Sequence, residues 1–311
     1  MEFFKKITQI DFMGLRHYTI PASVVLFILS LSLIIVRGLN LGVDFTGGTV
    51  IEVAYEQPTD LSAVRSQLGS GKFEDAQVQH FGTSQDVLIR LAPREGLSSA
   101  VVSEQVLEVL RQGGKVKVAL RRVEFVGSQV GGELVEAGGM ALLFATFGIL
   151  VYVAIRFEYR MAVGAIVAMF HDPILVLGWF SLFQVEFDLT VLAAILAVIG
   201  YSLNDTVVVF DRIRETFRKL RRVSPPEVVN TAVNETLSRT IMTSVATFLA
   251  VIAMFLWGGK VLYGFSLALM VGIVVGTYSS IFIASPVALV LGLNRETLMP
   301  PRKDEEGTIQ G

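Results

Sequence analysis

The sequence predicts a polytopic α-helical membrane protein. Six transmembrane helices are expected, with an α+β ferredoxin-like external domain between the first and second helices. Hydrophobic residues make up 52% of the chain and charged residues only 17%, whereas charged residues make up about 25% of a soluble domain. Apolar runs of about 20 residues, the length that spans a bilayer, recur along the chain. They lie near residues 19–36, 138–155, 161–183, 189–210, 240–257 and 264–291.

The first apolar run, Thr19–Val36, follows the basic residues Lys5, Lys6 and Arg16. Basic residues ahead of an apolar run also occur in secretory signal peptides. Here, however, no small-residue cleavage site follows, and the run is long for the core of a signal peptide. We therefore expect a transmembrane helix that is retained in the mature protein.

The loops between the predicted spans differ in their basic residues. Lysine and arginine concentrate in one set of loops and in the tail, at Arg156, Arg160, Arg212, Arg214, Arg218, Lys219, Arg221, Arg222, Arg295, Arg302 and Lys303. The other set, residues 184–188 and 258–263, contains only Lys260. Because basic loops remain cytoplasmic, both termini are expected in the cytoplasm. The predicted segments are residues 1–37 (cytoplasmic N-terminus and first helix), 38–137 (external domain), 138–294 (five-helix membrane region) and 295–311 (cytoplasmic tail).

Strand and helix patterns alternate within the predicted external domain. Apolar residues alternate, as in a half-buried strand, at residues 49–55, 76–81, 87–91 and 116–120. Helical spacing is found in Leu61–Leu68 and in Val102–Leu110, where Gly113-Gly114 ends the second helix. The order β-α-β-β-α-β is that of a ferredoxin-like unit. The pairs Gly131-Gly132 and Gly138-Gly139 predict a flexible exit into the second membrane helix.

An amide and an acid, Asn204 and Asp205, interrupt the apolar run Leu189–Phe210. An ionisable group at membrane depth costs about 2.5–3.5 kcal/mol on insertion scales, so it needs a partner or a function. One interpretation is a structural polar pair that joins two helices. We favour the other, in which Asp205 is a proton-responsive carboxylate, because an acid can ionise and is a poorer interhelical link than an amide.

Arg239 lies at the start of the fifth apolar run and shares a helix face with Thr243. By itself, an arginine in this position is more typical of an interfacial residue that snorkels to the membrane surface. If Arg239 faces Asp205, it becomes a counter-ion. Burial favours the neutral acid and a guanidinium favours the ionised one. These opposed effects could poise Asp205 to bind and release a proton near neutral pH.

His171 and Asp172 precede Pro173 within the third apolar run. Proline removes a backbone hydrogen bond, and the two polar side chains could satisfy the groups that it frees. A proton relay through His171 is the other interpretation. We place His171, Asp172 and Thr243 second to Asp205, Arg239 and Asn204 as candidate proton-pathway residues.

Small residues recur every fourth position along the last apolar run. They are Gly264, Ala268, Gly272, Gly276, Ser280 and Ala284. This spacing places them on one helix face and predicts close packing against another helix. That helix could belong to this chain or to a partner subunit.

Several classes of function lack their residues in this sequence. There is no cysteine, and no phosphate-binding glycine loop, metal-ligand cluster or serine hydrolase motif is found. We therefore expect neither an enzyme nor a cofactor, a metal or a nucleic-acid partner. The energy available to a membrane carboxylate is the ion gradient, about 2.3 kcal/mol per charge per 100 mV.

A glycine-rich motif follows the first span. It reads Gly42-Val43-Asp44-Phe45-Thr46-Gly47-Gly48 and resembles the GVDFTGG signature of the SecF family of bacterial protein-export subunits. Further matches are Arg156–Glu158, His171-Asp172, Ile199–Thr206, Asn234–Thr240 and Tyr263–Phe265. The resemblance covers nearly the whole chain.

This resemblance implies a function and a set of partners. SecF proteins pair with SecD, are related to the RND transporters, and assist the SecYEG channel and the SecA motor in the bacterial inner membrane. The pair is thought to use the proton gradient to draw the translocating polypeptide outward, after the SecA-driven step. The family's proton-pathway residues correspond here to Asp205 and Arg239, with protons and membrane lipid as further expected partners.

Three other functions are considered. An RND-type half-transporter for a lipid or small molecule shares the architecture and is the main alternative. An intramembrane aspartyl protease would use Asp205 and Asp172 as a dyad, but those enzymes carry a Gly-x-Gly-Asp pattern, and Ser202-Leu203-Asn204 precedes Asp205 here. A purely structural subunit would tolerate neutral substitutions at Asp205 and Arg239.

Overall fold

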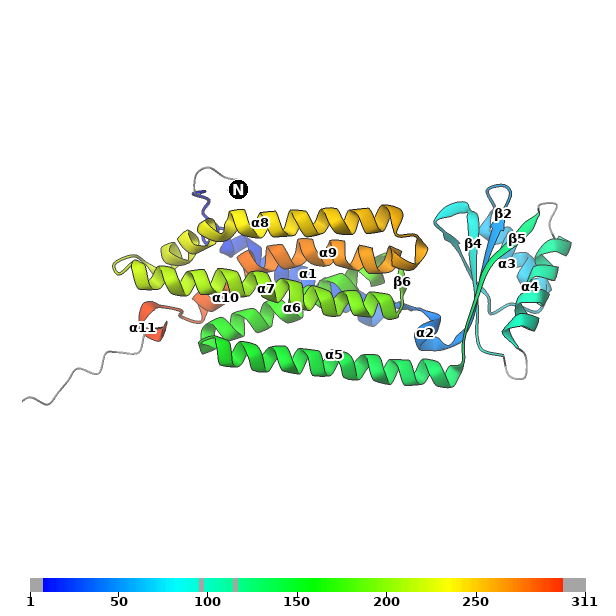
Figure 1. Cartoon of the computed structure of the whole chain (residues 1–311), viewed down its shortest axis with the longest axis horizontal. Coiled ribbons are helices and arrows are strands. Elements are labelled where there is room, and N and C mark those ends of the chain that lie inside the picture. Colours follow the sequence, from blue (N-terminus) through cyan, green and yellow to red (C-terminus); the bar gives the residue numbers. More distant parts are fainter. Residues whose placement is uncertain (1–7, 95–97, 114–116, 299–311) are drawn as a thin grey trace, which may run out of the picture.

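The computed structural model describes residues 8–94, 98–113 and 117–298. The chain forms a long helical bundle with an α+β domain at one end (Figure 1). Some predicted features lie outside the described residues: Lys5, Lys6, Gly114, Val116, Arg302, Lys303 and the tail beyond residue 298.

Six helices among the described residues are long and apolar enough to cross a membrane, which confirms the predicted number. Five of them are α1 (Arg16–Arg37), α5 (Ser128–Arg156), α6 (Tyr159–Phe183), α7 (Leu189–Lys219) and α8 (Pro225–Trp257), and the sixth, Tyr263–Val290, begins with α9 (Tyr263–Ser279). Helix α9 continues through a π-helical turn, Ser280–Ala284, into α10 (Ser285–Val290). A short helix, α11 (Arg295–Leu298), lies at the end of the bundle opposite the external domain (Figure 1).

Two helices begin well before their apolar runs. Helix α8 begins at Pro225, where Ser224 and Glu227 form a capping box. Helix α5 begins at Ser128, so Gly131-Gly132 and Gly138-Gly139 lie inside it and the predicted flexible exit is wrong. A β-carbon on Gly131 would lie 3.0 Å from the backbone nitrogen of Gly47. Glycine at position 131 therefore permits close packing and does not break the helix.

The small-residue face of α9 packs against α7 of the same chain. A β-carbon would come within 3.0 Å of α7 at three of these glycines, in the pairs Gly264 with Val191, Gly272 with Val198 and Gly276 with Ser202. Tight helix packing is thus confirmed, and the partner helix is internal. Helix α7 also packs against α6 and α8, which places it at the centre of the bundle.

The external domain has the predicted β-α-β-β-α-β order. Its elements are β2 (Gly48–Tyr55), α3 (Leu61–Ser70), β3 (Gln77–Phe81), β4 (Thr83–Leu91), α4 (Ser99–Gly113) and β5 (Val118–Val126). The strands form one antiparallel sheet in the order β3-β4-β2-β5. Helices α3 and α4 cover the face of the sheet that points away from the bundle (Figure 1).

Successive side chains of β2 and β4 point to opposite faces of the sheet. Ile51, Val53 and Ile89 are fully buried in the core under α3 and α4. Val50 and Leu88 point to the other face and pack with Val43. The second face of the sheet is therefore turned toward the outer end of the membrane bundle.

Three short elements join the domain to the bundle. They are β1 (Asn40–Leu41), α2 (Val43–Thr46) and β6 (Glu186–Phe187), the last of which lies between α6 and α7. Strands β1 and β6 pair in parallel, with Asn40 opposite Glu186 and Leu41 opposite Phe187.

Candidate functional site

Asp205 lies within α7 and is 3% exposed, so its side chain is enclosed by the bundle. Its Oδ2 atom is buried and has no hydrogen-bond partner among the described residues. A carboxylate left without donors in a low-dielectric environment is costly when ionised. Protonation of Asp205 removes that charge, so this side chain can exchange a proton without first breaking a hydrogen bond to Oδ2.

Arg239 of α8 is the charged group that acts electrostatically on Asp205. Its side chain is exposed on the surface of this chain and makes no hydrogen bond to Asp205 Oδ2. The two residues are therefore near each other without a direct contact at that atom. The counter-ion role of Arg239 therefore stays a prediction.

The other predicted pathway residues lie on the outer surface of the bundle. Asn204 is exposed, although it is adjacent to the buried Asp205. Thr243 is also exposed, and its hydroxyl donates to the backbone oxygens of Arg239 (3.1 Å) and Thr240 (2.9 Å). Polar groups at membrane depth are costly against lipid. Asn204 of α7 and Arg239 and Thr243 of α8 are here called the polar face, and such exposed polar side chains on apolar helices are suited to contact with another protein.

Asp172 occupies a second polar site in the bundle and is completely buried. Its Oδ2 accepts hydrogen bonds from Ser202 of α7 and, at 2.7 Å, from Ser279 of α9. Its Oδ1 lies 2.9 Å from His171 Nδ1. The carboxyl group thereby links α6, α7 and α9.

His171 completes this second site. Its ring stacks on Phe27 of α1 with centroids 6.4 Å apart, and its Nε2 is buried without a partner in the described part of the chain. Helix α6 continues through Pro173. The hydrogen bonds of His171 and Asp172 connect them to each other and to the two serines. The expectation that they satisfy the groups freed by Pro173 is therefore wrong for the described residues.

The glycine-rich motif contacts the outer end of α7. Asp44 Oδ2 accepts a hydrogen bond from the backbone nitrogen of Leu189, the first residue of α7, at 3.1 Å. The backbone nitrogen of Gly42 donates to Phe187 O at 2.7 Å. Phe45 stacks on Phe187 with centroids 5.7 Å apart. The motif thus fastens the start of the external domain to the helix that carries Asp205.

The last two glycines of the motif have positive φ angles, 68° at Gly47 and 123° at Gly48. A β-carbon on Gly48 would lie 2.3 Å from Leu91 O. Both the backbone conformation and the space therefore require glycine at position 48.

An ion pair missed by the sequence prediction lies beside the motif. Arg90 of β4 and Glu186 of β6 are 2.5 Å apart, with side chains 10% and 24% exposed. Arg90 also donates to Leu41 O at 2.8 Å and Asn40 Oδ1 at 3.2 Å. Burial raises the pKa of Glu186, and the charge of Arg90 opposes that shift. An arginine within an apolar strand was a usable signal, but its partner lies in another part of the chain.

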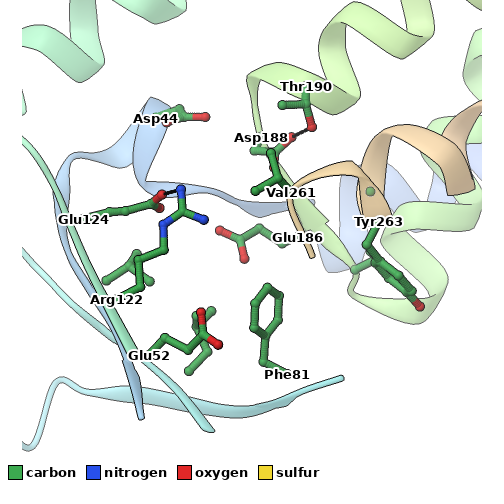
Figure 2. Close-up of a pocket in the computed structure, with 14 residues that line it drawn as sticks. Asp44, Glu52, Phe81, Arg122, Glu124, Glu186, Asp188, Thr190, Val261 and Tyr263 are labelled. Carbon is green, nitrogen blue, oxygen red and sulfur yellow. Dashed lines mark hydrogen bonds and ion pairs between the residues drawn. The ribbon is translucent and has the colours of Figure 1, made fainter. Parts of the chain in front are cut away.

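A cavity of about 220 Å³ lies between the sheet and the outer ends of α7 and α9. Figure 2 shows that Glu186 and Asp188 approach it from the bundle side, and Glu52, Arg122 and Glu124 from the sheet. Despite these carboxylates, no group of three or more His, Asp or Glu side chains among the described residues is arranged to hold a metal ion.

The bundle, its buried carboxylate and the inserted α+β domain define a multi-pass membrane transport protein. Comparison with known proteins agrees and is more specific. Residues 105–294 match the family described as "Protein export membrane protein SecD/SecF, C-terminal". Residues 32–59 match the "SecD/SecF GG Motif".

Relatives named "Protein translocase subunit SecF" match over nearly the whole chain. The protein from Vibrio alginolyticus is 48% identical over 96% of this chain and 95% of its own length. The protein from Pseudomonas aeruginosa is 49% identical over 96% of each. The chain therefore belongs to the SecD/SecF family, as a SecF-type subunit of the protein translocase, and it is a transport protein rather than an enzyme.

Solved structures of SecDF show the same fold. The crystal structure of SecDF from Thermus thermophilus, described as a translocon-associated membrane protein, superimposes with a TM-score of 0.83 at 36% identity over 91% of this chain. SecDF in a super-membrane-facing form gives a TM-score of 0.67 at 34% identity over 93%. This chain spans 39% of the length of either SecDF chain.

Proposed function

We propose that this chain pairs with SecD and uses the proton gradient to promote the outward translocation of polypeptides after the SecA-driven step. The buried carboxyl group of Asp205, with Oδ2 unpartnered, carries the proposal. An ionisable group inside a membrane bundle is characteristic of proton and ion pathways. One proton crossing the membrane releases about 2.3 kcal/mol per 100 mV.

Protonation changes the charge of Asp205 in a site where Arg239 is the group that acts on it electrostatically. Ionised Asp205 is attracted to the guanidinium, whereas the neutral acid is not. Loading and release of a proton thus change the attraction between α7 and α8. In this proposal, that change is the first mechanical consequence of proton entry.

The polar face supports the pairing with SecD. Asn204, Arg239 and Thr243 are exposed on helices that are long and apolar enough to cross a membrane, and a protein neighbour would remove them from lipid. The two solved SecDF chains are longer than this one, which matches 39% of each. We propose that the SecD half covers the polar face and completes the proton pathway around Asp205.

The remaining partners and the orientation follow from the same proposal. The termini are cytoplasmic and the domain at residues 38–137 is external in the bacterial inner membrane, as the basic loops indicate. SecYEG and SecA deliver the translocating polypeptide, which the external domain then contacts on the outer side.

The test is precursor export in cells where Asp205→Asn replaces the wild-type protein, with the amount of the SecD complex measured in the same cells. We expect export to fall while the complex persists, and a protonophore to cause no further loss. The control is Asp211→Asn on the same helix. Asp211 forms an exposed ion pair with Arg156, of a kind worth little, so export should be retained.

Unchanged export in the Asp205→Asn cells, with a normal level of the complex, would refute the proton-coupled function. Export that is normal while transport of a lipid or small molecule is lost would favour an RND-type half-transporter.

A further inference from the structure

We propose that Asp44, Arg90 and Glu186 are positioning residues of a joint that stays closed and transmits movement of α7 to the external domain. The joint comprises residues 39–48, Arg90 and residues 184–189. This inference rests on the proposed proton-coupled function, because α7, the helix to which the joint is bonded, carries Asp205.

The first component of the joint is a backbone attachment. Strands β1 and β6 pair in parallel over two residues each. The bond from Gly42 N to Phe187 O, 2.7 Å long, extends this pairing by one step. Backbone hydrogen bonds of this kind hold the segment before β2 in register with the segment before α7.

The second component is a shared helix cap. The first backbone N–H groups of a helix have no partner within the helix, and carboxylates bind them favourably. Asp188 caps α7 locally by accepting from Val191 N at 2.9 Å. Asp44 adds a second carboxylate at Leu189 N, from a segment 145 positions away in the sequence. A shift of α7 along its axis would therefore be passed directly to α2.

The third component is the Arg90–Glu186 ion pair, which connects the sheet itself to β6. Arg90 is 9% exposed, and its guanidinium also bonds the backbone oxygen of Leu41 and the side chain of Asn40. One side chain of the external domain thus holds both β1 and β6. Removal of Glu186 would leave a buried arginine without its counter-ion, which is costly.

The domain has a second connection to the membrane through α5. This helix begins at Ser128, immediately after β5, and Gly131 packs against Gly47. Helix α2 is therefore held between α5 and the outer end of α7. The cavity of about 220 Å³ lies beside the joint, and Asp44 and Glu186 are among the residues that line it (Figure 2). The sheet therefore meets the bundle through the joint and through α5.

External pH acts on the joint through Glu186. Burial raises the pKa of Glu186 in the closed joint, whereas a solvent-exposed carboxyl group would return to its ordinary value. Asp44, Asp188 and Arg90 are the charged groups that act on it. The closed joint therefore binds a proton more tightly than an opened one, and falling external pH favours the closed state. Glu186→Gln removes the negative charge but keeps a side-chain oxygen that can accept a hydrogen bond from Arg90, so it should hold the joint closed better than Glu186→Ala does.

The experiment uses membrane vesicles that contain the complex with SecD, and measures how much the proton gradient stimulates precursor translocation. We expect Asp44→Ala and Glu186→Ala to lower that stimulation about three- to tenfold, the ratio that corresponds to the loss of one cap or polar contact. Asp44→Asn and Glu186→Gln should retain most of it. The matched control is Asp75→Ala, which removes the Arg94 partner within the external domain, away from the joint.

A covalent replacement gives the sharper test. The chain has no cysteine, and Asn40 and Glu186 are register partners, at a spacing that suits a disulfide. In Asn40→Cys/Glu186→Cys, the reduced protein should lose stimulation and the oxidised protein should regain it. Each single variant, Asn40→Cys or Glu186→Cys, should show low stimulation by the gradient whether the protein is reduced or oxidised. The control pair Ala54→Cys/Ala119→Cys joins β2 to β5 within the domain. Oxidation of this pair should not change the stimulation by the gradient.

Either of two outcomes would refute the proposal that the joint transmits movement of α7. The oxidised pair could be no more active than the reduced pair, or Asp44→Ala and Glu186→Ala could keep full stimulation while Asp205→Asn loses it. In the latter case the proposed proton-coupled function is supported and the proposed role of the joint is refuted. If the wild-type complex itself shows no stimulation by the gradient, both proposals fail.

Discussion

Asp205 and Asp172 are two carboxyl groups buried in the same bundle, 3% and 0% exposed, with opposite hydrogen-bonding environments. Ser202, Ser279 and His171 supply partners to both oxygens of Asp172. The Oδ2 atom of Asp205 has no partner. Burial alone therefore does not separate a structural acid from a candidate proton-binding one. A fully satisfied network rigidifies a core, whereas an unsatisfied carboxylate is expected to change its charge.

The two sites share helix α7, which carries Asp205 and one of the donors to Asp172. Ser202, which donates to Asp172, precedes Asp205 by three residues on α7. The Asp172 network thus holds α7 against α6 and α9 close to the free carboxyl group. This contrast supports the proposal that Asp172 keeps the register of the three helices and that Asp205 binds the proton.

The largest effect on function is expected at Asp205. Asp205→Asn should abolish gradient-stimulated export, yet change the free energy of unfolding by less than about 1 kcal/mol, because Oδ2 loses no hydrogen bond. Thermal unfolding of the purified protein in detergent checks the second part. A large loss of stability would show that Asp205 is structural, like Asp172.

The largest effect on stability is expected at Asp172. Asp172→Ala leaves His171, Ser202 and Ser279 without their acceptor. The bundle should lose about 3–5 kcal/mol, as when one partner of a buried polar pair is removed. The measurement is the thermal midpoint together with the level of the SecD complex in cells. Normal stability combined with lost gradient dependence would instead place Asp172 in the proton pathway.

Smaller losses are expected when the donors are removed one at a time. Ser202→Ala and Ser279→Ala should each cost about 1 kcal/mol of unfolding free energy, the typical net value of a hydrogen bond. Because both serines donate to the same Oδ2 atom, the double variant should differ from the sum of the single variants. Strict additivity would argue against a shared acceptor.

The smallest effect is expected at His171. Its Nε2 is buried without a partner, and its ring stacks on Phe27. His171→Phe keeps an aromatic ring and removes the unsatisfied nitrogen, at the loss of one bond to Asp172. The change in stability should be below about 1 kcal/mol, with export retained. Loss of gradient-stimulated export in a stable His171→Phe protein would support the proton relay.

Hydropathy and periodicity predicted most of the fold. The apolar runs identified all six long helices of the described chain, and period-two alternation identified the ferredoxin-like order of the external domain. Hydropathy failed at the start of α8, where residues from Pro225 onward are helical before the apolar run begins. Buried residues there, such as Val228, Ala232 and Thr236, follow helical spacing. This capped, amphipathic first part of α8 is not apolar enough to be predicted as a membrane segment.

The candidate site was only partly accessible to sequence reasoning. Asp205 was recognisable because an acid inside an apolar run is costly wherever the run folds. The sequence could not show that Asp172 is satisfied, since its partners Ser202 and Ser279 lie 30 and 107 positions away. It also could not show that Asn204 faces outward while its neighbour Asp205 faces inward.

Local properties of this protein could be predicted from the sequence: which segments are apolar enough to span a membrane, which strands and helices form between the first two spans, and which acid interrupts an apolar run. These properties depend on hydrophobicity and on periodicity along the chain. The pairing of distant polar groups, as in Asp44 with Leu189 and Arg90 with Glu186, became visible in the folded chain alone. A hydrogen bond or ion pair depends on separation in space, and the packing of α7 among its neighbours sets those separations.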